Sequence, residues 1–294
     1  TAHLAEGSDI PVAVGAGTIN DLVKLAAERV GRPYLVVGTA ASMDGYTSFG
    51  ASILYKGNKQ TMACAAPRAV AADLDVIRRA PSPLVAWGYA DLMAKVVSGA
   101  DWILAEALGV EAIDPVAWSL VQGELASALT EPEALVRGDA AAFGRLVEGL
   151  MMSGLAMQYT GTSRPASGAE HQFSHLWDME HHVYKGEVPS HGFKVGVATH
   201  FISWIYGQLL REPLDRLDVA AACARWRPEP EVDAAARQLF GSGEIQDLAR
   251  RERAAKHVTS EELAAHLNLL RTCWPELRER LQRQLLPSAE IRTT

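Results

Sequence analysis

Three histidines lie close together in the second half of this chain. His171 and His175 are four residues apart, and His191 follows beside Gly192. If the first pair lies on a helix, both rings share one helix face. Imidazoles that converge from two segments commonly bind a divalent metal. The spacing therefore predicts a metal site, although a pair at this spacing is also found on solvated helix faces.

A carboxylate is needed beside such histidines, and Asp91 is the best candidate. It lies in an apolar, helical pattern, GYADLMAK, where a carboxylate should be paired, capped or bound to metal. Lys95 follows at i+4, so an Asp91–Lys95 ion pair is the competing interpretation and the favoured one for these two residues alone. Asp91 can pair with Lys95 and bind the metal at the same time.

Two segments near the start are suited to binding a ligand. Residues 15–21, GAGTIND, lie where an apolar strand meets a helix, so the backbone can approach a diphosphate. Asn20 stands where a full G-x-G-x-x-G pattern has its third glycine. An ordinary tight turn is therefore the alternative interpretation of this segment. Residues 39–48 place Asp44 and Gly45 among small hydroxyl side chains, which indicates a ligand loop or a plain polar turn.

These groups must be positioned by two kinds of structure. The first 80 residues predict short strands at 11–14 and 34–37, a helix at 20–30, a hairpin of 51–55 with 60–64 around 56–59, and one more strand within 69–77. After Pro81, helical spacing dominates at 84–108, 115–130, 140–158, 171–184, 194–210, 233–239, 260–271 and 274–286. We therefore expect a partial α/β dinucleotide-binding domain at 1–80 and an all-helical metal and substrate domain at 81–294.

Composition narrows the class of protein. The net charge of −7 argues against non-specific nucleic-acid binding. Three widely spaced cysteines form no disulfide framework, which favours a reducing cytoplasm. The sequence predicts no membrane span and no signal peptide. His181 and His182 are expected at the surface, and His3, His200, His257 and His266 are expected to be structural.

Taken together, the motifs resemble those of the sn-glycerol-1-phosphate dehydrogenases, in particular the bacterial branch. That family belongs to the iron-containing alcohol dehydrogenase and dehydroquinate synthase superfamily. The resemblance spans nearly the whole chain and rests on GAGTINDLVK at 15–24, TAASMDGYTS at 39–48, ADLMAK at 90–95 with Asp101 and Trp102, SRPASGAEHQFSH at 163–175 and SHGFKVG at 190–196.

The resemblance implies a Rossmann-like domain followed by a helical metal domain. It implies zinc, or another divalent metal such as nickel or iron, held by Asp91, His171 and His191. Asp44, Asp91 and His175 match substrate-contacting positions, and Asp91 and His175 are the implied catalytic residues. NAD or NADP would be bound by Gly15, Ala16, Gly17, Thr18, Ile19, Thr39, Ala40, Ala41, Ser42 and Ser48.

The implied reaction interconverts dihydroxyacetone phosphate and sn-glycerol 1-phosphate. The nicotinamide supplies the hydride, and the metal polarises the carbonyl. The substrate is then a small phosphorylated ketone or polyol, with Lys194, Arg164 and Lys95 as candidate phosphate-binding side chains. The family also implies a homo-oligomer.

Three departures from the family pattern matter. Family members carry an additional N-terminal stretch with the opening strands of the dinucleotide fold, so this chain is expected to lack those strands, and NAD versus NADP stays open. Ala41 stands where the family often has proline. Lys95 stands where related iron alcohol dehydrogenases have a fourth histidine ligand, which favours a three-ligand site with an open position.

Two other functions compete with the dehydrogenase. A sugar-phosphate cyclase of the dehydroquinate synthase type would reduce and reoxidise NAD within one turnover. A non-catalytic truncated homologue would bind metal or ligand without turnover.

Overall fold

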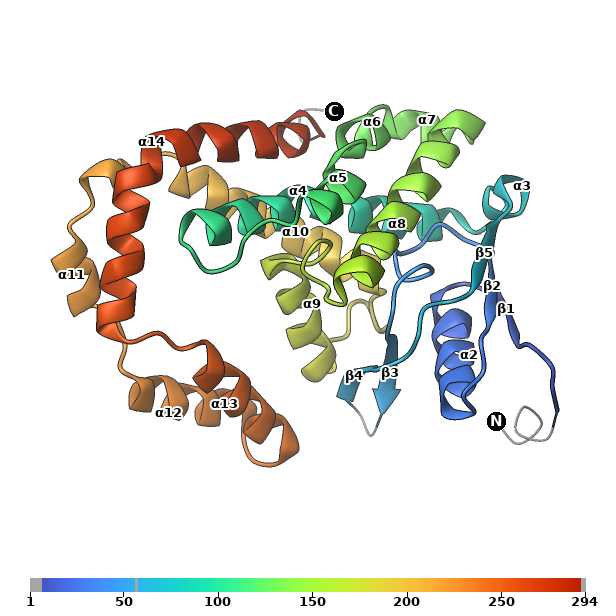
Figure 1. Ribbon diagram of the computed structural model, residues 1–294, viewed down its shortest axis with the longest axis horizontal. Helices are drawn as coiled ribbons and strands as arrows, with labels where there is room; N and C mark the ends of the chain where they lie inside the picture. The colour runs from blue at the N-terminus through green and yellow to red at the C-terminus, as the bar shows by residue number, and fades with distance from the viewer. Residues whose placement is uncertain (1–6, 56–57, 292–294) are drawn as a thin grey trace.

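The computed structural model describes residues 7–55 and 58–291 of the 294-residue chain. A small parallel sheet with its helix forms one end of the molecule, and helices form the rest (Figure 1). This order confirms the predicted fold class, an α/β part followed by a helical part. None of the described helices is long and apolar enough to cross a membrane.

The sheet has three parallel strands in the order β1-β2-β5. They are β1 (Val12–Gly15), β2 (Leu35–Gly38) and β5 (Ala69–Ala72), and helix α2 (Gly17–Arg29) connects the first two. Val36 from β2 and Ala27 from α2 are buried in a small apolar core. The helix thus packs on one face of the sheet and places both strand ends, Gly15 and Gly38, side by side.

The opposite face of β1 is exposed to solvent. Val12 and Val14 are 48% and 61% exposed, whereas Ala13 between them is buried. Parallel sheets are normally covered on both faces. The described residues therefore cover this sheet on one side only.

The predicted hairpin is present. Strands β3 (Ala51–Tyr55) and β4 (Asn58–Met62) pair antiparallel, so the second strand begins and ends two residues earlier than the predicted 60–64. Lys56 and Gly57, which were predicted in the turn, lie outside the described residues, as does His3. The last predicted strand is shorter than its segment: β5 ends at Ala72, and helix α3 (Leu74–Ile77) follows. Asp73 caps that helix by accepting the backbone N–H groups of Asp75 and Val76.

The helical part is built around α4 (Ser82–Ala107), which is buried over most of its length. Helices α10 (His191–Leu209) and α14 (Ser260–Ile291) pack on it, and Leu92, Val96 and Leu281 are fully buried at this centre. The remaining helices are α5 (Pro115–Gln122), α6 (Leu125–Leu129), α7 (Pro132–Val136), α8 (Ala140–Thr160), α9 (Ala169–Met179), α10 (His191–Leu209), η1 (Leu214–Arg216), α11 (Val219–Ala224), α12 (Glu229–Phe240), α13 (Glu244–Lys256) and α14 (Ser260–Ile291).

Several predicted helix boundaries are wrong. The single helix expected at 115–130 is two helices, since the chain turns at Gly123 and Glu124. The helix expected at 171–184 ends at Met179, because His181 adopts a left-handed φ of 51°. The two helices expected at 260–271 and 274–286 are one helix that continues through Pro275.

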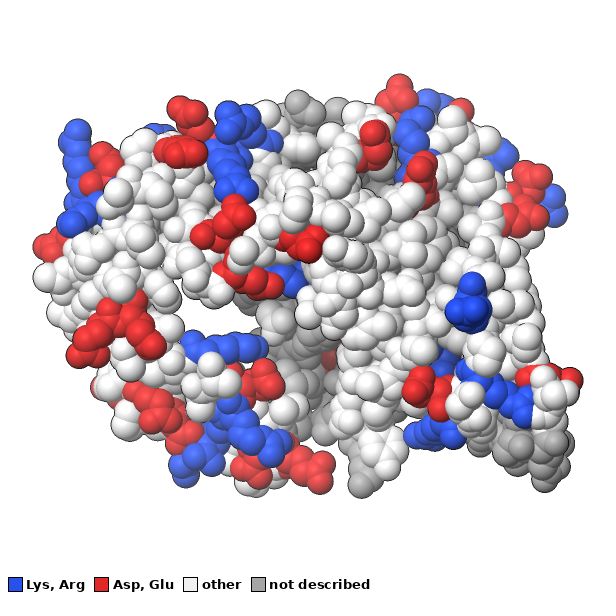
Figure 2. Space-filling view, viewed as in Figure 1, with Lys and Arg blue, Asp and Glu red and all other residues white. Residues whose placement is uncertain are grey.

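Charged side chains on the face shown in Figure 2 are of both signs and interspersed, with many of them over the α11 to α14 region at the left. On the described residues of this face no continuous basic surface is visible.

Candidate active site

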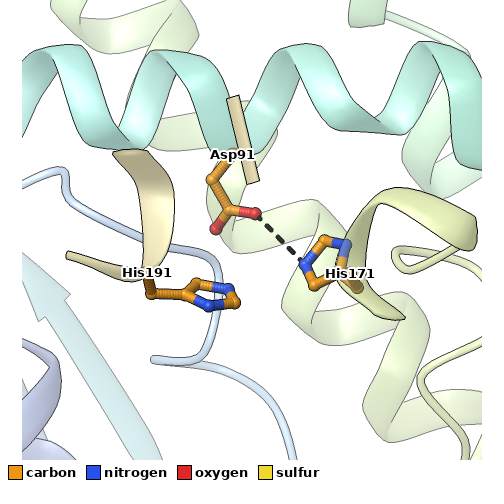
Figure 3. A group of neighbouring side chains, drawn as sticks. All are labelled: Asp91, His171 and His191. Atoms are coloured by element: carbon orange, nitrogen blue, oxygen red, sulfur yellow. Dashed lines mark ion pairs between the residues drawn. The ribbon is translucent and has the colours of Figure 1, made fainter. Parts of the chain in front are cut away.

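Asp91, His171 and His191 lie together, and each offers a ligand atom. These atoms all lie within 4.8 Å of one another. The carboxylate of Asp91 hangs from α4 toward the two imidazoles, which come from α9 and from the start of α10 (Figure 3). Asp91 and His171 are buried and His191 is half-buried. A carboxylate and two imidazoles at this spacing form a donor set that suits a divalent transition metal.

Close helix packing brings these three side chains together. A Cβ on Gly192, the second residue of α10, would lie 2.2 Å from the carbonyl oxygen of Trp87 on α4. Only glycine permits that approach. The side chain of Ser190 accepts the backbone N–H of Phe193, which fixes the helix start at His191. The sequence SHG therefore places His191 against α4.

Asp91 is held in its charged form by its neighbours. Its Oδ1 lies 3.0 Å from Nζ of Lys95 and 3.7 Å from Nε2 of His171. Burial alone would raise the pKa of the Asp91 carboxyl, but the charge of Lys95, followed by those of His191 and His171, lowers it to about 2. The expected Asp91–Lys95 ion pair and the cluster with both histidines occur together.

Asp44 joins the same buried network from the loop after β2. Its Oδ2 lies 2.8 Å from Nζ of Lys95 and accepts a hydrogen bond of 2.8 Å from Oγ of Ser153. Burial alone would lower the pKa of Lys95, but Asp44 and Asp91 together raise it. Asp44, which was expected to contact substrate, is thus linked to the Asp91 carboxylate through Lys95.

His171 has a carboxylate on its other side. Its Nδ1 lies 2.6 Å from Oε1 of Glu170, which is fully buried. Glu170 was not predicted from the sequence as a site residue. An acidic residue directly before a candidate ligand histidine is the only signal the sequence offers, and acidic residues are common in the first turn of any helix.

His175 lies one turn after His171 on α9 and is half-buried. The helical spacing was therefore interpreted correctly, but His175 is not part of the three-residue cluster. Of the other histidines, His181, His182 and His200 are exposed and His257 and His266 are half-buried.

The loop at residues 39–50 is fixed from several sides. Nζ of Lys24, on α2, donates to the backbone carbonyls of Gly45, Ser48 and Gly50 at 3.2, 2.9 and 2.9 Å. Burial lowers the pKa of Lys24. The hydroxyl of Tyr46 donates to the carbonyl of Ala40 at 2.8 Å. Lys24, which orders this loop, was not predicted from the sequence.

The glycine turn lies at the start of α2, as expected. Ala16 is the N-cap without a side-chain cap, and no acidic residue lies in the first helical turn. The N–H groups of this turn are therefore suited to an anion. A Cβ on Gly17 would lie 2.9 Å from Cε of Met43, so the Met43 side chain covers this glycine.

The other expected cofactor residues differ in burial. Ala40, Ala41 and Ser48 are buried, Thr39 and Ser42 are half-buried with Gly15, and Thr18 and Ile19 are exposed.

Each candidate phosphate-binding cation has a carboxylate partner. Lys194 pairs with Asp178, and Arg164 lies 2.9 Å from Glu111. Lys95 is enclosed by Asp44 and Asp91. A substrate phosphate at any of them would have to compete with, or displace, that partner.

Comparison with known proteins confirms the resemblance predicted from the motifs. Residues 1–81 match the family described as iron-containing alcohol dehydrogenase. The chain is 39% identical over 211 residues to glycerol-1-phosphate dehydrogenase (NAD(P)+) of Halalkalibacterium halodurans, covering 72% of this chain and 53% of the relative. It is 34% identical over 225 residues to the Pyrococcus furiosus protein of the same name, covering 75% of this chain and 64% of the relative. The chain thus spans about half the length of the curated relatives it matches.

Solved structures show the same fold at lower identity. A probable glycerol dehydrogenase from Sinorhizobium meliloti 1021 superposes with a TM-score of 0.56 at 19% identity, covering 91% of this chain and 78% of that one. Glycerol dehydrogenase from Schizosaccharomyces pombe gives a TM-score of 0.52, also at 19% identity, covering 94% and 71%.

Proposed function

Because this chain is a relative of the glycerol-1-phosphate dehydrogenases, we propose that it belongs to a metal-dependent, NAD(P)-linked dehydrogenase that interconverts dihydroxyacetone phosphate and sn-glycerol 1-phosphate. The observation that carries the proposal is the convergence of Asp91, His171 and His191 beside the loop at residues 39–50. A metal donor set and a nicotinamide-side loop would both be required next to the same substrate carbonyl.

The donor set supports a divalent metal, and zinc is the proposed one. One carboxylate and two imidazoles leave a coordination position open, as catalytic zinc sites do. When bound, the metal would polarise the substrate carbonyl and the nicotinamide would supply the hydride.

The chain's own residues would prepare this chemistry. Lys95 and the backbone N–H of Asp44 hold the Asp91 carboxylate charged and aligned. The turn at Gly15, Ala16, Gly17, Thr18 and Ile19 would bind the cofactor diphosphate through backbone N–H groups. Thr39, Ala40, Ala41, Ser42 and Ser48 would line the nicotinamide side, where the buried alanines exclude water.

Two further residues would contact the substrate. His175 would hold the substrate or relay a proton at a ring nitrogen, since it is half-buried one helical turn beyond His171. Asp44 would orient a substrate hydroxyl through its carboxylate. A cytoplasmic location and a homo-oligomer remain predictions.

The test measures NADH and NADPH oxidation with dihydroxyacetone phosphate, using zinc-loaded protein beside His171→Ala. Removing a metal ligand should lower the rate of NAD(P)H oxidation by at least roughly 100-fold, and the bound zinc should be lost on dialysis. His182→Ala removes an exposed imidazole of the same segment and is the matched control, with activity unchanged.

Other outcomes identify the competing functions. Phosphate release without net NADH consumption would favour a sugar-phosphate cyclase. Bound zinc without binding of either dinucleotide would favour a non-catalytic role. Either result contradicts the dehydrogenase proposal.

A further inference from the structure

Glu170, which directly precedes the proposed metal ligand His171, is a buried carboxylate in contact with that ligand. Glu170 is fully buried, and its Oε1 accepts the backbone N–H of Gly168 at 2.9 Å while lying 2.6 Å from Nδ1 of His171. A carboxylate oxygen can only accept, so Nδ1 of His171 carries the proton in this contact. In the Nδ1–H tautomer the lone pair is on Nε2, the nitrogen that lies 3.7 Å from Oδ1 of Asp91.

The side chain of Glu170 has little freedom to leave this position. A Cβ on Gly168 would lie 2.4 Å from Oδ2 of Asp101 and 2.9 Å from Oε2 of Glu170. Asp101 in turn accepts the backbone N–H of Ala169 at 2.7 Å and the hydroxyl of Tyr206 at 2.5 Å. Asp101 thus holds the first turn of α9, and Glu170 is the carboxylate that contacts the His171 ring.

A purely structural cap would not need this charge. Oε2 of Glu170 is buried and has no hydrogen-bond partner within the described part of the chain. A buried, incompletely paired carboxylate is costly, and a neutral amide would cap Gly168 at lower cost. The negative charge is favourable if a cation lies on the far side of the imidazole.

We propose that Glu170 is the positioning residue for His171: it holds the Nδ1–H tautomer and presents Nε2 to the divalent metal. Carboxylates in this place orient the ring and make the imidazole a stronger donor. The proposal rests on the metal site of the proposed function. Nδ1 of the other proposed histidine ligand, His191, lies 3.5 Å from Oγ of Ser174.

The first experiment measures zinc affinity by chelator competition in wild type, Glu170→Gln and Asp101→Asn. Glutamine keeps the shape and a carbonyl acceptor but removes the charge, so we expect zinc binding weaker by about 10- to 100-fold. Asp101→Asn is the control, since it removes a half-buried carboxylate on α4 that accepts a backbone N–H from this turn but makes no hydrogen bond or ion pair with His171 in the described part of the chain. Its zinc affinity should stay within about 3-fold of wild type. Equal affinity in wild type and Glu170→Gln overturns the proposal.

A second readout does not depend on a variant. Nitrogen-15 NMR of the zinc-loaded wild type should show His171 protonated at Nδ1 and ligated at Nε2, and the opposite assignment overturns the proposal.

Cobalt substitution should give a visible spectrum that changes in Glu170→Gln and returns toward wild type in Glu170→Asp, which restores the charge. A wild type that binds neither metal would overturn the metal site itself, and with it this inference. Tight binding that is insensitive to Glu170 would remove the inference alone.

Discussion

The backbone N–H of Asp44 donates a hydrogen bond of 3.0 Å to Oδ2 of Asp91. Lys95 bridges the same two residues, at 2.8 Å from Oδ2 of Asp44 and 3.0 Å from Oδ1 of Asp91. The loop that follows β2 and the carboxylate that hangs from α4 are therefore tied by two independent contacts. The arrangement of the loop and that of the metal donor set depend on each other.

Replacing Lys95 with methionine should make folding depend on metal. The change leaves two buried carboxylates without their cation, and we expect a loss of about 3–5 kcal/mol in the free energy of unfolding. Zinc should then raise the melting temperature more in Lys95→Met than in wild type, because the metal replaces the missing charge.

Lys256→Met is the control for this variant. Lys256 pairs with Glu252 at the surface, both more than half exposed, so stability should hardly change. Equal zinc-induced shifts in the wild type and Lys95→Met, measured by calorimetry, would contradict the interpretation of Lys95 as the counter-ion.

A methyl group at Gly88 should displace the loop. A Cβ there would lie 1.9 Å from the carbonyl oxygen of Ala41, which is backbone and cannot rotate away. We expect Gly88→Ala to cost about 3 kcal/mol in chemical denaturation. Gly207→Ala, in α10 with open space around it, should be neutral or stabilise by about 0.5–1 kcal/mol. Similar values for the two variants would show that the close approach is absent.

Lys24→Met tests the ordering of the loop from the other side. Three backbone carbonyls lose their donor, which should cost roughly 3 kcal/mol and increase amide hydrogen exchange at residues 45–50. KM for the nicotinamide cofactor should rise more than kcat falls, because the bound geometry of the loop is lost. Lys185→Met, at an exposed position, is the control. Unchanged exchange at 45–50 would contradict the role given to Lys24.

Alkaline pH should weaken the fold through Tyr46. Burial raises the pKa of its hydroxyl to about 12, above the ordinary value of 10.0. A raised pKa contributes stability that is complete below pH 10 and is lost as the pH rises toward 12. Tyr46 should account for roughly 2 kcal/mol of that loss.

Urea denaturation at pH 8 and pH 11.5 checks this contribution. Tyr46→Phe should be less stable than wild type at pH 8, because the hydrogen bond to Ala40 is gone, but should lose less between the two pH values. Tyr89, with a pKa also raised to about 12 by burial, contributes a similar slope in both proteins. A loss as large in Tyr46→Phe as in wild type would rule out Tyr46 as a source of the alkaline sensitivity.

Periodicity in the sequence predicted most of the helices, but not where tertiary packing overrides local preference. The sequence predicted separate helices at 260–271 and 274–286, yet α14 continues between them because Trp274, Leu277 and Leu281 are buried in the main core. The short helices α7 and α11 and the charged helix α13 were missed. Their apolar stripes are too short or too sparse to show a period.

The contacts of the candidate site also fall into those that local sequence spacing predicted and those that it did not. The local pair Asp91–Lys95 was visible as an i,i+4 spacing, and it is formed. The contact between Lys95 and Asp44 joins residues far apart in the sequence, and no local pattern signals it. Glu170 was missed for another reason: its chemistry follows from which nitrogen of His171 it faces, and that is a property of the fold alone.

The loop at residues 39–50 also determines how the two parts of the molecule can move. Helices α4 and α8 grip it through Gly88 and Gly154, where an added Cβ would lie 1.9 Å from Ala41 O and 2.4 Å from Asp44 O, and α2 holds its other side through Lys24. A segment held by both parts can be the fixed point of a rotation, but it prevents one part from sliding past the other. Opening and closing around a substrate would then be a rotation about this loop, with the largest displacements at the far edge of the sheet and the smallest at Asp91.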